Sequence, residues 1–503
     1  MAVAILYSRA QLGVDAPLVT IEVFLSGGLP TFSIVGMPET AVRESKDRVR
    51  SAILSANFEF PQRRITVNLG PADMRKTGGR FDLAIALGIL AASGQVRDAA
   101  FASHEFFGEL ALNGELRRVP GALPAALRAS EAGRAMVVPA GNVDEATLAC
   151  DNVLAASCLL EVTAHLNDLE LLPKQRRCQL PLMPGYIADL SDVKGQQRAK
   201  RALEIAAAGG HNLLFIGPPG AGKSMLAQRL PGLLPPLSES EAIATAAVDS
   251  VLGVPIDVGR WRQRPFRAPH HTATAAALVG GGSEPRPGEI SRAHNGVLFL
   301  DELPEFSRHV LEVLREPLET GRITISRAAA QSEFPARFQL VAAMNPCPCG
   351  YLGDPLANCN CSADRVRAYR DRVSGPLLDR IDIQLEVQRP AAKLLRANAA
   401  PGEPSSAAAK RVQQARERQL ARAQRCNAML ETARLRRCAV VSSAAEQLLE
   451  RAADRHGLSA RCYQRMLRVA LTIADLAAVA TVDETHMAEA LSLRGVSERR
   501  AAA

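Results

Sequence analysis

A glycine-rich loop in the middle of the chain constrains the fold more than any other feature of the sequence. Residues 217–224 read GPPGAGKS and match the pattern G-x-x-x-x-G-K-[ST]; the apolar run 213–216 (LLFI) precedes them and an apolar helical stretch follows. A strand, such a loop and a helix in this order surround phosphates with backbone N–H groups and a helix N-terminus. Lys223 is expected to reach the β- and γ-phosphates, and the Ser224 hydroxyl to bind Mg²⁺. The predicted nucleotide-binding residues are Gly217, Pro218, Pro219, Gly220, Ala221, Gly222, Lys223 and Ser224.

Two carboxylates follow a second apolar strand, 297–302 (VLFLDE). Asp301 is predicted to bind the magnesium ion of a nucleotide. Glu302 is predicted to orient and deprotonate the attacking water, because hydrolysis needs a base within hydrogen-bonding distance of that water. A third predicted strand, 339–344, ends at Asn345. Asn345 either polarises the same water or is a turn residue before Pro346, and the spacing leaves both alternatives open.

The length and the alternation of patterns predict more than one domain, because 503 residues exceed what a single hydrophobic core usually serves. Residues 1–171 alternate between short strands and helices, and 172–190 form a linker rich in proline and polar residues. Residues 191–390 carry the nucleotide motifs, 391–408 form a second linker, and 409–503 are predominantly helical in pattern. We therefore predict an α/β protein with a helical C-terminal lid.

The overall charge favours a polyanionic partner, although it is a weak signal. Lys and Arg total 60 against 52 Asp and Glu, which gives a net charge of +8 and a pI near 9.1. The N-terminal residues lack the pattern of a secretory signal, and no apolar stretch is long enough to span a bilayer. We expect a cytoplasmic protein without membrane association.

Four of the ten cysteines form a cluster, C-x-C-x9-C-x-C, in a loop that contains proline and glycine. A disulfide framework is not expected in a cytoplasmic chain. Four thiolates at this spacing suit a closed tetrahedral Zn²⁺ site, and the alternative is free thiols in a flexible loop. The predicted zinc ligands are Cys347, Cys349, Cys359 and Cys361.

Long stretches of the sequence carry a family resemblance that covers nearly the whole chain. They are FSIVGMPETAVRESKDRVRSAI at 32–53, PFRAPHHTATAAALVGGG at 265–282, PGEISRAHNGVLFLDELPEF at 287–306 and FPARFQLVAAMNPCPCGYLGD at 334–354. With these motifs the chain resembles the ComM/YifB family of magnesium-chelatase-like AAA+ ATPases. The resemblance implies an AAA+ P-loop core with a helix-2 insert and a pre-sensor hairpin, a helical lid, ATP and Mg²⁺ as ligands, and a ring that is a hexamer.

The resemblance also implies two arginines that contact nucleotide. Arg380, in SGPLLDRIDI, matches the arginine that reaches the nucleotide of the next subunit and stabilises charge on the transferred phosphoryl group. Its alternative role is as an ion-pair partner of Asp379 or Asp382. Arg461, in SARCYQRMLR, matches the sensor-2 position, and Arg465 or Arg468 could take its place.

The function that the resemblance implies is an ATP-driven DNA helicase that promotes branch migration, extending recombination of incoming single strands during natural transformation. Single-stranded and branched DNA are the implied partners, with a recombinase as a further one. The insert and the predicted hairpin 322–338 would project into a central pore and grip DNA phosphates. The candidate DNA contacts are Arg322, Arg327 and Arg337, each of which could instead form a solvated surface pair.

The N-terminal domain resembles the proteolytic domain of Lon, which has the ribosomal S5 domain 2-like fold, most closely at 106–129 (FFGELALNGELRRVPGALPAALRA). The positions of the catalytic serine and lysine fall near Phe81 and Ala126, so the domain is predicted not to be a peptidase. Ring assembly, DNA contact or partner docking are the expected uses. Basic candidates for a contact are Arg75, Lys76 and Arg80, and the alternative for them is a solvated loop.

Two other functions compete with the DNA motor. The first is the ATPase subunit of a metal chelatase, which shares the insert-bearing core but, by the resemblance, lacks the Lon-like domain. The second is a scaffold ring that uses ATP only to assemble. A complete set of hydrolysis residues, Lys223, Asp301, Glu302 and Arg380, disfavours the scaffold, because assembly needs only nucleotide binding.

Overall fold

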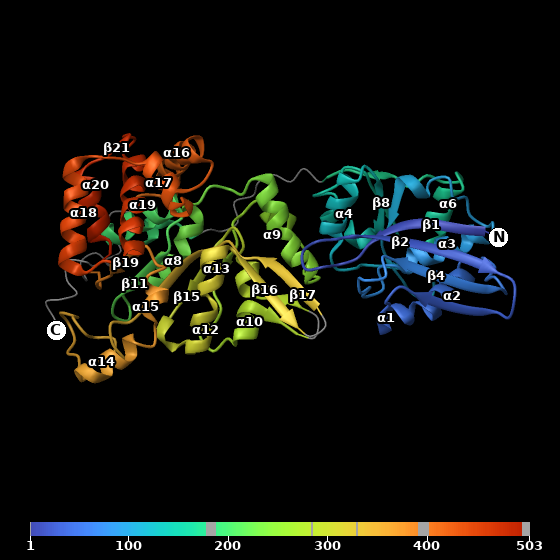
Figure 1. Ribbon diagram of the computed structural model, residues 1–503, viewed down its shortest axis with the longest axis horizontal. Helices are drawn as coiled ribbons and strands as arrows, with labels where there is room; N and C mark the ends of the chain where they lie inside the picture. The colour runs from blue at the N-terminus through green and yellow to red at the C-terminus, as the bar shows by residue number, and fades with distance from the viewer. Residues whose placement is uncertain (1, 178–187, 283–284, 328–329, 391–401, 495–503) are drawn as a thin grey trace. The chain divides into compact units, whose positions relative to one another are not determined.

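The computed structural model describes residues 2–177, 188–282, 285–327, 330–390 and 402–494 (Figure 1). The chain forms two compact units and passes between them more than once. Unit 1 comprises 1–183, 239–261 and 326–334, and unit 2 comprises 184–238, 262–325 and 335–503. The segments 239–261 and 326–334, which the sequence places within the predicted ATPase core, are therefore packed with unit 1.

The first sheet of unit 1 has the strand order β1-β2-β4-β3, in which only β3 and β4 run parallel. Along β2 the residues alternate between buried and more exposed, as expected for a strand with one face on a core. Helix α3 is buried over almost all of its surface and packs on β1 and β2. Gly88 permits this close approach, because a Cβ there would lie 2.5 Å from Cγ2 of Val23. The bounds are β1 Ala2–Arg9, β2 Leu18–Ser26, β3 Thr31–Val35, α1 Thr40–Arg43, α2 Ser45–Ser55, β4 Arg64–Gly70 and α3 Asp82–Ala92.

The second sheet of unit 1 has the order β10-β9-β8-β5, with β5, β8 and β9 parallel and β10 antiparallel at one edge. Every residue of β8 is buried. Continuous burial is typical of a parallel strand that is covered on both faces. The bounds are β5 His104–Phe106, β6 Glu109–Leu110, β7 Leu116–Arg117, α4 Ala122–Glu131, β8 Ala135–Pro139, α5 Val143–Ala146, β9 Val153–Ala156, α6 Leu159–Leu166 and β10 Lys174–Gln175.

Helix α9 (Glu239–Val251) lies in the sequence between the glycine loop and the acidic pair, yet it packs on α4 of unit 1. Its apolar residues Ile243 and Ala247 join a cluster with Leu123. The carbonyl oxygen of Ser250 accepts a hydrogen bond of 2.9 Å from the backbone N–H of Gly121. One segment of the chain between the two nucleotide motifs, 239–261, is thus part of unit 1.

Unit 2 contains a five-stranded parallel sheet of order β12-β15-β18-β11-β19. Because every strand runs the same way, the segments that follow the strands meet at one edge of the sheet, which is where ligands bind in such sheets. The strand bounds are β11 Leu213–Ile216, β12 Phe266–Arg267, β15 Val297–Leu300, β18 Gln339–Met344 and β19 Ile383–Glu386.

The other helices and strands of unit 2 before residue 391 are short, except for α7. The helices are α7 Gln197–Gly209, α8 Lys223–Arg229, α10 Ala275–Val279, α11 Glu289–Arg292, α12 Arg308–Val313, α13 Arg315–Thr320, α14 Ala363–Arg370 and α15 Gly375–Leu378. Two strand pairs accompany them: β13 Gly280–Gly281 with β14 Arg286–Pro287, and the hairpin of β16 Arg322–Arg327 with β17 Ala330–Pro335.

The C-terminal helices, orange to red in Figure 1, share a hydrophobic core with the parallel sheet of unit 2. Helices α16 and α19 both contact α7. Polar side chains fix their ends: Ser459 caps α19, and Asp483 forms a capping box with His486 at the start of α20. The bounds are α16 Ser405–Ala423, α17 Thr432–Cys438, β20 Val440–Val441, α18 Ser443–His456, α19 Ala460–Leu476, β21 Thr481–Val482 and α20 Glu484–Ser492.

No helix among the described residues is both long and apolar enough to cross a membrane.

Candidate nucleotide site and arginine cluster

Lys223 lies at the edge of the parallel sheet where β11 and β18 end. Its ammonium donates hydrogen bonds to the carbonyl oxygens of Gly217 at 2.6 Å and Pro218 at 3.0 Å, and to Oδ1 of Asn345 at 3.0 Å. Burial lowers the pKa of Lys223, and the charges of Asp301 and Glu302 oppose that shift. The sequence-predicted Lys223 and Asn345 are therefore in direct contact.

Ser224 and Asp301 form the second contact of this site. The Ser224 hydroxyl donates to Oδ2 of Asp301 at 2.5 Å, and Oδ1 of Asp301 accepts from the backbone N–H of Glu302 at 2.9 Å. A hydroxyl and a carboxylate supply the oxygen ligands that Mg²⁺ prefers. These two side chains fit the predicted metal position of a bound magnesium nucleotide.

Positions 217, 220 and 222 of the glycine loop disfavour residues other than glycine. A Cβ at Gly217 would overlap the carbonyl oxygen of Val387, and Gly220 and Gly222 have φ angles of 79° and 87°. Both angles lie in the left-handed region that side chains disfavour. Backbone N–H groups can approach phosphate oxygens closely in a loop without side chains, so the backbone also fits the predicted ligand.

Glu302 is exposed, whereas Lys223 is buried and Asp301 half-buried, and a residue without a predicted role contacts Glu302. Its side chain is 52% exposed, its φ is 52°, and its Oε2 lies 3.1 Å from Nδ1 of His271. The sequence signal is the pair His270–His271 within the stretch 265–282, one of the stretches that carry the family resemblance.

A second residue without a predicted role, Arg389, links the glycine loop to the cysteine loop. Its Nε donates to the carbonyl oxygen of Pro219 at 3.2 Å and lies 3.3 Å from a carboxylate oxygen of Asp354. Its guanidinium also lies over the ring of Tyr351, 5.4 Å from the centroid. Its sequence signal is only its position, three residues after β19.

Arg380 lies at the opposite edge of the sheet from Lys223. Its carbonyl oxygen accepts a hydrogen bond of 2.9 Å from Nδ2 of Asn212, the residue before β11, whereas the glycine loop follows β11. The four residues of β11 span roughly 10 Å at a strand's rise per residue. The structure therefore does not bring Arg380 to the nucleotide loop of its own chain.

The partner of Arg380 is Glu319 of α13, with which its guanidinium forms an ion pair. The alternative partners named from the sequence have other contacts: Asp379 lies 3.6 Å from Arg494, and Asp382 lies 2.5 Å from Arg465. Burial lowers the pKa of Arg380. Arg380 thus pairs with Glu319, which is 61 positions away in the sequence, and not with Asp379 or Asp382.

Arg461 shares this location. Its side chain is 68% exposed and lies 3.8 Å from Glu319, so Arg380 and Arg461 approach the same carboxylate. Both line a cavity of about 200 Å³. The other lining residues are Glu319, Asp379, Gln464, Arg465 and Arg468. The predicted sensor-2 arginine is thus beside the predicted trans-acting arginine, and both are at the edge opposite Lys223.

Arg465 serves the fold. Asp382 is almost fully buried, and although burial alone raises the pKa of a carboxyl group, the Arg465 charge holds the pKa of Asp382 well below its usual range. His211 lies 3.7 Å from the same carboxylate. Arg465 therefore joins α19 to the start of β19 and is less available to a ligand than Arg461.

The candidate DNA-contact arginines do not all lie at the same end of the β16–β17 hairpin. Arg322 begins β16 and Arg337 follows β17, and both are exposed at the base, where the backbone N–H of Ala336 donates to Gly321. Arg327 is the last residue of β16, at the end of that strand opposite Arg322. Its side chain lies outside the described part of the chain.

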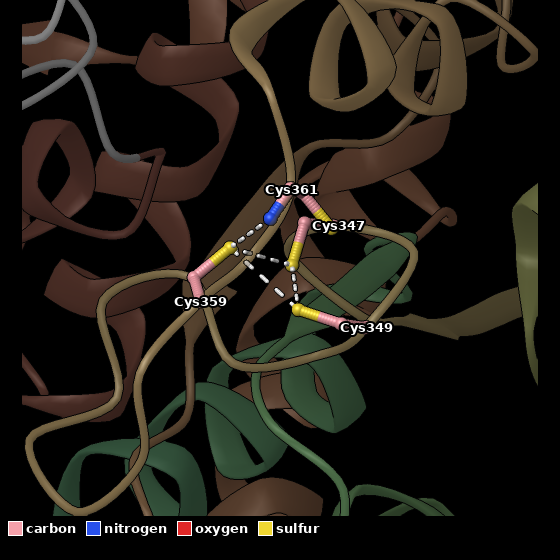
Figure 2. Close-up of side chains that lie close together, drawn as sticks. All are labelled: Cys347, Cys349, Cys359 and Cys361. Carbon is pink, nitrogen blue, oxygen red and sulfur yellow. Dashed lines mark hydrogen bonds between the residues drawn. The ribbon is translucent and has the colours of Figure 1, made fainter.

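The cysteine cluster is compact (Figure 2). The Sγ atom of Cys347 lies 3.3 Å from that of Cys349 and 3.7 Å from that of Cys359, and the latter two are 3.6 Å apart. The four Sγ atoms all lie within 4.8 Å of one another. A tetrahedral zinc ion with bonds of about 2.3 Å needs sulfur atoms about 3.8 Å apart, so the arrangement fits Zn²⁺.

Neighbouring thiols of the cluster shift one another's pKa. The backbone N–H of Tyr351 is the main cause that lowers the pKa of Cys349 to about 6. The backbone N–H of Cys361 also stabilises a thiolate at Cys359, but desolvation and the neighbouring thiols outweigh it and raise the pKa of Cys359 to about 12. Negative charge on one sulfur opposes charge on the next, which is the situation that a bound cation relieves.

The structure corrects one expectation for unit 1. Lys76 is fully buried and its ammonium donates to the carbonyl oxygen of Pro71, and Arg80 is buried and donates to Oε1 of Gln11 at 2.7 Å. For Lys76 and Arg80, the prediction of a contact with a partner at the surface and its alternative, a solvated loop, are therefore both wrong. Arg75 alone of the three is largely exposed, 4.0 Å from Glu39.

The comparisons with known proteins give matches along most of the chain. The model described as "Magnesium chelatase, subunit ChlI" matches residues 189–395, "Subunit ChlI of Mg-chelatase" matches 21–142, and "Magnesium chelatase, subunit ChlI C-terminal" matches 402–494.

Among individual relatives, the chain is 50% identical over 502 residues to "Competence protein ComM" of Haemophilus influenzae, covering 99% of this chain and 98% of that protein. It is 48% identical over 498 residues to "Uncharacterized protein YifB" of Salmonella typhimurium, with the same coverage. The "Magnesium-chelatase 38 kDa subunit" of Cereibacter sphaeroides is 27% identical over 182 residues, which cover 31% of this chain and 52% of that protein.

Proposed function

Because the chain belongs to the ComM/YifB family of magnesium-chelatase-like AAA+ ATPases, we propose that it is an ATP-driven DNA motor that moves branch points during recombination of incoming strands in natural transformation. The observation that carries the ATPase part is the cluster of Lys223, Ser224, Asp301 and Asn345 beside Glu302. The DNA part rests on the similarity over nearly the full length to a protein named for competence, and on the net positive charge.

In this proposal each residue of the cluster has one task. Lys223 would bind the β- and γ-phosphates of ATP in place of its carbonyl partners. Ser224 and Asp301 would hold Mg²⁺, which would neutralise part of the negative charge of the phosphates. Asn345 orients the attacking water, and Glu302 accepts its proton. The contact between Lys223 and Asn345 supports this assignment, because it places the amide next to the group that binds the γ-phosphate.

Arg380 and Arg461 act in trans in this proposal. Their position at the sheet edge opposite Lys223 supports it, because a ring with head-to-tail contacts brings that edge of one subunit toward the nucleotide of the next. The exposed guanidinium of Arg461 and that of Arg380 would then leave Glu319 and bind the phosphates of a neighbouring chain. We propose a hexamer for this ring.

The remaining assignments concern DNA and zinc. We propose that Arg327 contacts DNA phosphates first, because it is at the end of β16 away from the base, and that Arg322 and Arg337 contact them from the base. A recombinase is the proposed protein partner. We also propose that Zn²⁺ binds the four clustered cysteines and ties their loop to the glycine loop.

The chelatase alternative keeps one argument in its favour. The model that matches residues 21–142 is itself described by a chelatase subunit name, so the N-terminal unit does not by itself disfavour that function. Against it, the similarity to the 38 kDa chelatase subunit covers only 31% of this chain. The scaffold alternative leaves Glu302 without a task.

The deciding experiment is branch migration of a labelled four-way DNA junction by the full chain with ATP, with Glu302→Gln and Lys223→Ala run beside it. Movement by the unchanged protein alone supports the DNA motor. An ATPase that ignores DNA and moves no junction would contradict it and favour the chelatase-like function.

A further inference from the structure

Helix α14, which follows the cysteine cluster in the sequence, contacts the short segment that follows β18. Nε of Arg370, the last residue of α14, donates a hydrogen bond of 3.1 Å to the carbonyl oxygen of Pro346. The preceding residue, Tyr369, is only 5% exposed, and the backbone N–H of Asn345 forms a hydrogen bond with its hydroxyl oxygen. Two successive residues of α14 therefore hold the two successive residues that come directly after β18.

The surroundings of Tyr369 keep its hydroxyl protonated and place it near the proposed catalytic base. Burial, together with the charge of Glu305, raises the pKa of Tyr369 to about 12, against the opposing effect of the hydrogen bond from Asn345. The charge of Glu302 also raises this pKa. A neutral hydroxyl has lone pairs that can accept the backbone N–H of Asn345. Tyr369 thus lies where the segments after β15 and β18 come together.

The cysteine cluster explains how the chain returns α14 to this place. Cys347 follows Asn345 by two positions, and Cys359 precedes Ser362, the residue that caps α14, by three. The Sγ atoms of Cys347 and Cys359 are 3.7 Å apart (Figure 2). The cluster therefore closes the loop between β18 and α14 at both of its ends, and the helix begins close to the strand from which the loop departs.

Asn345 needs such support from its backbone. Its Oδ1 accepts a hydrogen bond of 3.0 Å from the ammonium of Lys223. In the proposed function Lys223 also binds phosphates, so this contact alone does not fix the position of the amide. A small displacement of a group that orients a reactant lowers the rate strongly. The contacts from α14 hold the backbone of this segment whether or not a nucleotide is bound to Lys223.

We propose that α14 positions Asn345 for ATP hydrolysis, through the hydroxyl of Tyr369 and the guanidinium of Arg370. Neither residue touches the nucleotide in this inference, and both are positioning residues that act through Asn345. The inference rests on the proposed role of Asn345 in orienting the attacking water. It does not depend on DNA.

The test measures kcat and KM for ATP hydrolysis by the full chain without DNA. Tyr369→Phe removes the hydroxyl, keeps the ring, and should lower kcat about fivefold, the factor expected for one hydrogen bond. Arg370→Ala should lower kcat by a similar factor, and Arg370→Lys, which keeps a donor, should restore most of it. The KM should stay nearly unchanged in all three variants, because Lys223 and the glycine loop bind the phosphates.

Further variants show whether the two residues act through Asn345. Asn345→Ala should lower kcat more than Tyr369→Phe does. The double variant should be no slower than Asn345→Ala alone, because the tyrosine then has no amide to position. Arg367→Ala changes an exposed arginine of the same helix and should leave both constants unchanged. Arg370 is also exposed, so Arg370→Ala tests the inference even if Tyr369→Phe does not fold.

The outcomes separate this inference from the proposed function. A slow Asn345→Ala beside normal kcat values in Tyr369→Phe and Arg370→Ala overturns the inference and retains the role of Asn345. Losses that multiply in the double variant also overturn it. A loss in Tyr369→Phe that disappears in the Asn345→Ala background supports the inference, even if the unchanged protein moves no DNA junction, a result that would contradict only the DNA motor.

Discussion

At the scale of single residues, the members of the candidate nucleotide site could be named from the sequence, because short sequence patterns contain them. The glycine loop and the acidic pair each consist of residues that are close together in the sequence, so Lys223 and Asp301 could be named from the sequence alone. The partners of buried charges could not be named in this way. Arg380 pairs with Glu319 and Lys76 donates to Pro71, and these contacts depend on how distant segments or a single turn pack.

The first prediction at this scale concerns Glu302. Glu302→Gln should bind ATP with nearly unchanged affinity and lower kcat by about 10²-fold or more, because a positioned general base contributes 10²–10⁴-fold. Nucleotide binding and steady-state hydrolysis measure the two effects. Glu305→Gln is the matched control, since Glu305 forms an exposed pair with Arg372. A normal rate in Glu302→Gln would show that another group is the base.

The second prediction concerns the buried pair of Asp382 and Arg465. Arg465→Ala leaves the Asp382 charge buried without its closest partner and should lower the free energy of unfolding by about 3 kcal/mol. Asp382→Asn combined with Arg465→Met should cost less than the single change, because no unpaired charge remains. Denaturant unfolding of the variants measures both values, and equal costs would contradict the role of the charge.

The loss of stability in Arg465→Ala should depend on pH in a direction that follows from the pKa of Asp382. With Arg465 present, the pKa of Asp382 is below its unfolded value, so the pair stabilises above about pH 4 and this stabilisation is lost as the pH falls through the lower folded pKa. Without Arg465, burial raises the pKa, and the buried group takes up a proton as the pH falls. The difference in stability between the two proteins should therefore be largest near neutral pH and shrink in acid.

At the scale of elements, strands and helices were easier to predict than their packing. Strands β11 and β18 have the predicted bounds 213–216 and 339–344, because short apolar runs determine such elements directly. The packing of α9 on α4 was not predictable. Its alanine-rich sequence favours a helix, but the small apolar face fits many surfaces, and nothing local specifies which one.

One prediction at this scale concerns the zinc site that we propose in the cysteine loop. Gly350 of that loop lies against Pro219 of the glycine loop, close enough that a Cβ would come within 2.6 Å of the proline ring. Metal analysis should find one Zn²⁺ per chain, and Cys359→Ser should lose it and raise the KM for ATP. Cys426→Ser, a cysteine outside the cluster, should change neither. A Cys359→Ser variant with full zinc content would contradict the site.

At the scale of the whole molecule, we predict that hydrolysis needs a neighbouring chain, because Arg380 and Lys223 lie at opposite ends of the strands of one sheet. Arg380→Ala should still bind ATP through its own loop but hydrolyse it at least about 10³-fold more slowly, as expected for loss of a trans-acting arginine. Glu302→Gln should likewise be inactive by itself.

Mixing these two inactive proteins gives the test. In a ring, a Glu302→Gln chain supplies Arg380 to a neighbour that still has Glu302, so an equal mixture should recover up to about one quarter of the normal activity for random head-to-tail assembly. Arg380→Ala mixed with Lys223→Ala should recover activity for the same reason. A mixture as inactive as its components would mean that Arg380 acts within its own chain or not at all.

The return of α9 to unit 1 has a consequence for how this architecture can be inherited or engineered. The chain changes unit at residues 183/184, 238/239, 261/262, 325/326 and 334/335, so no single cut separates one unit from the other. Removing residues 1–183 would leave Ile243 and Ala247 without the Leu123 surface that buries them. Neither unit can therefore be exchanged between proteins as one continuous segment of sequence. A substitution on the surface of α4 that contacts α9 must be matched by a substitution on α9.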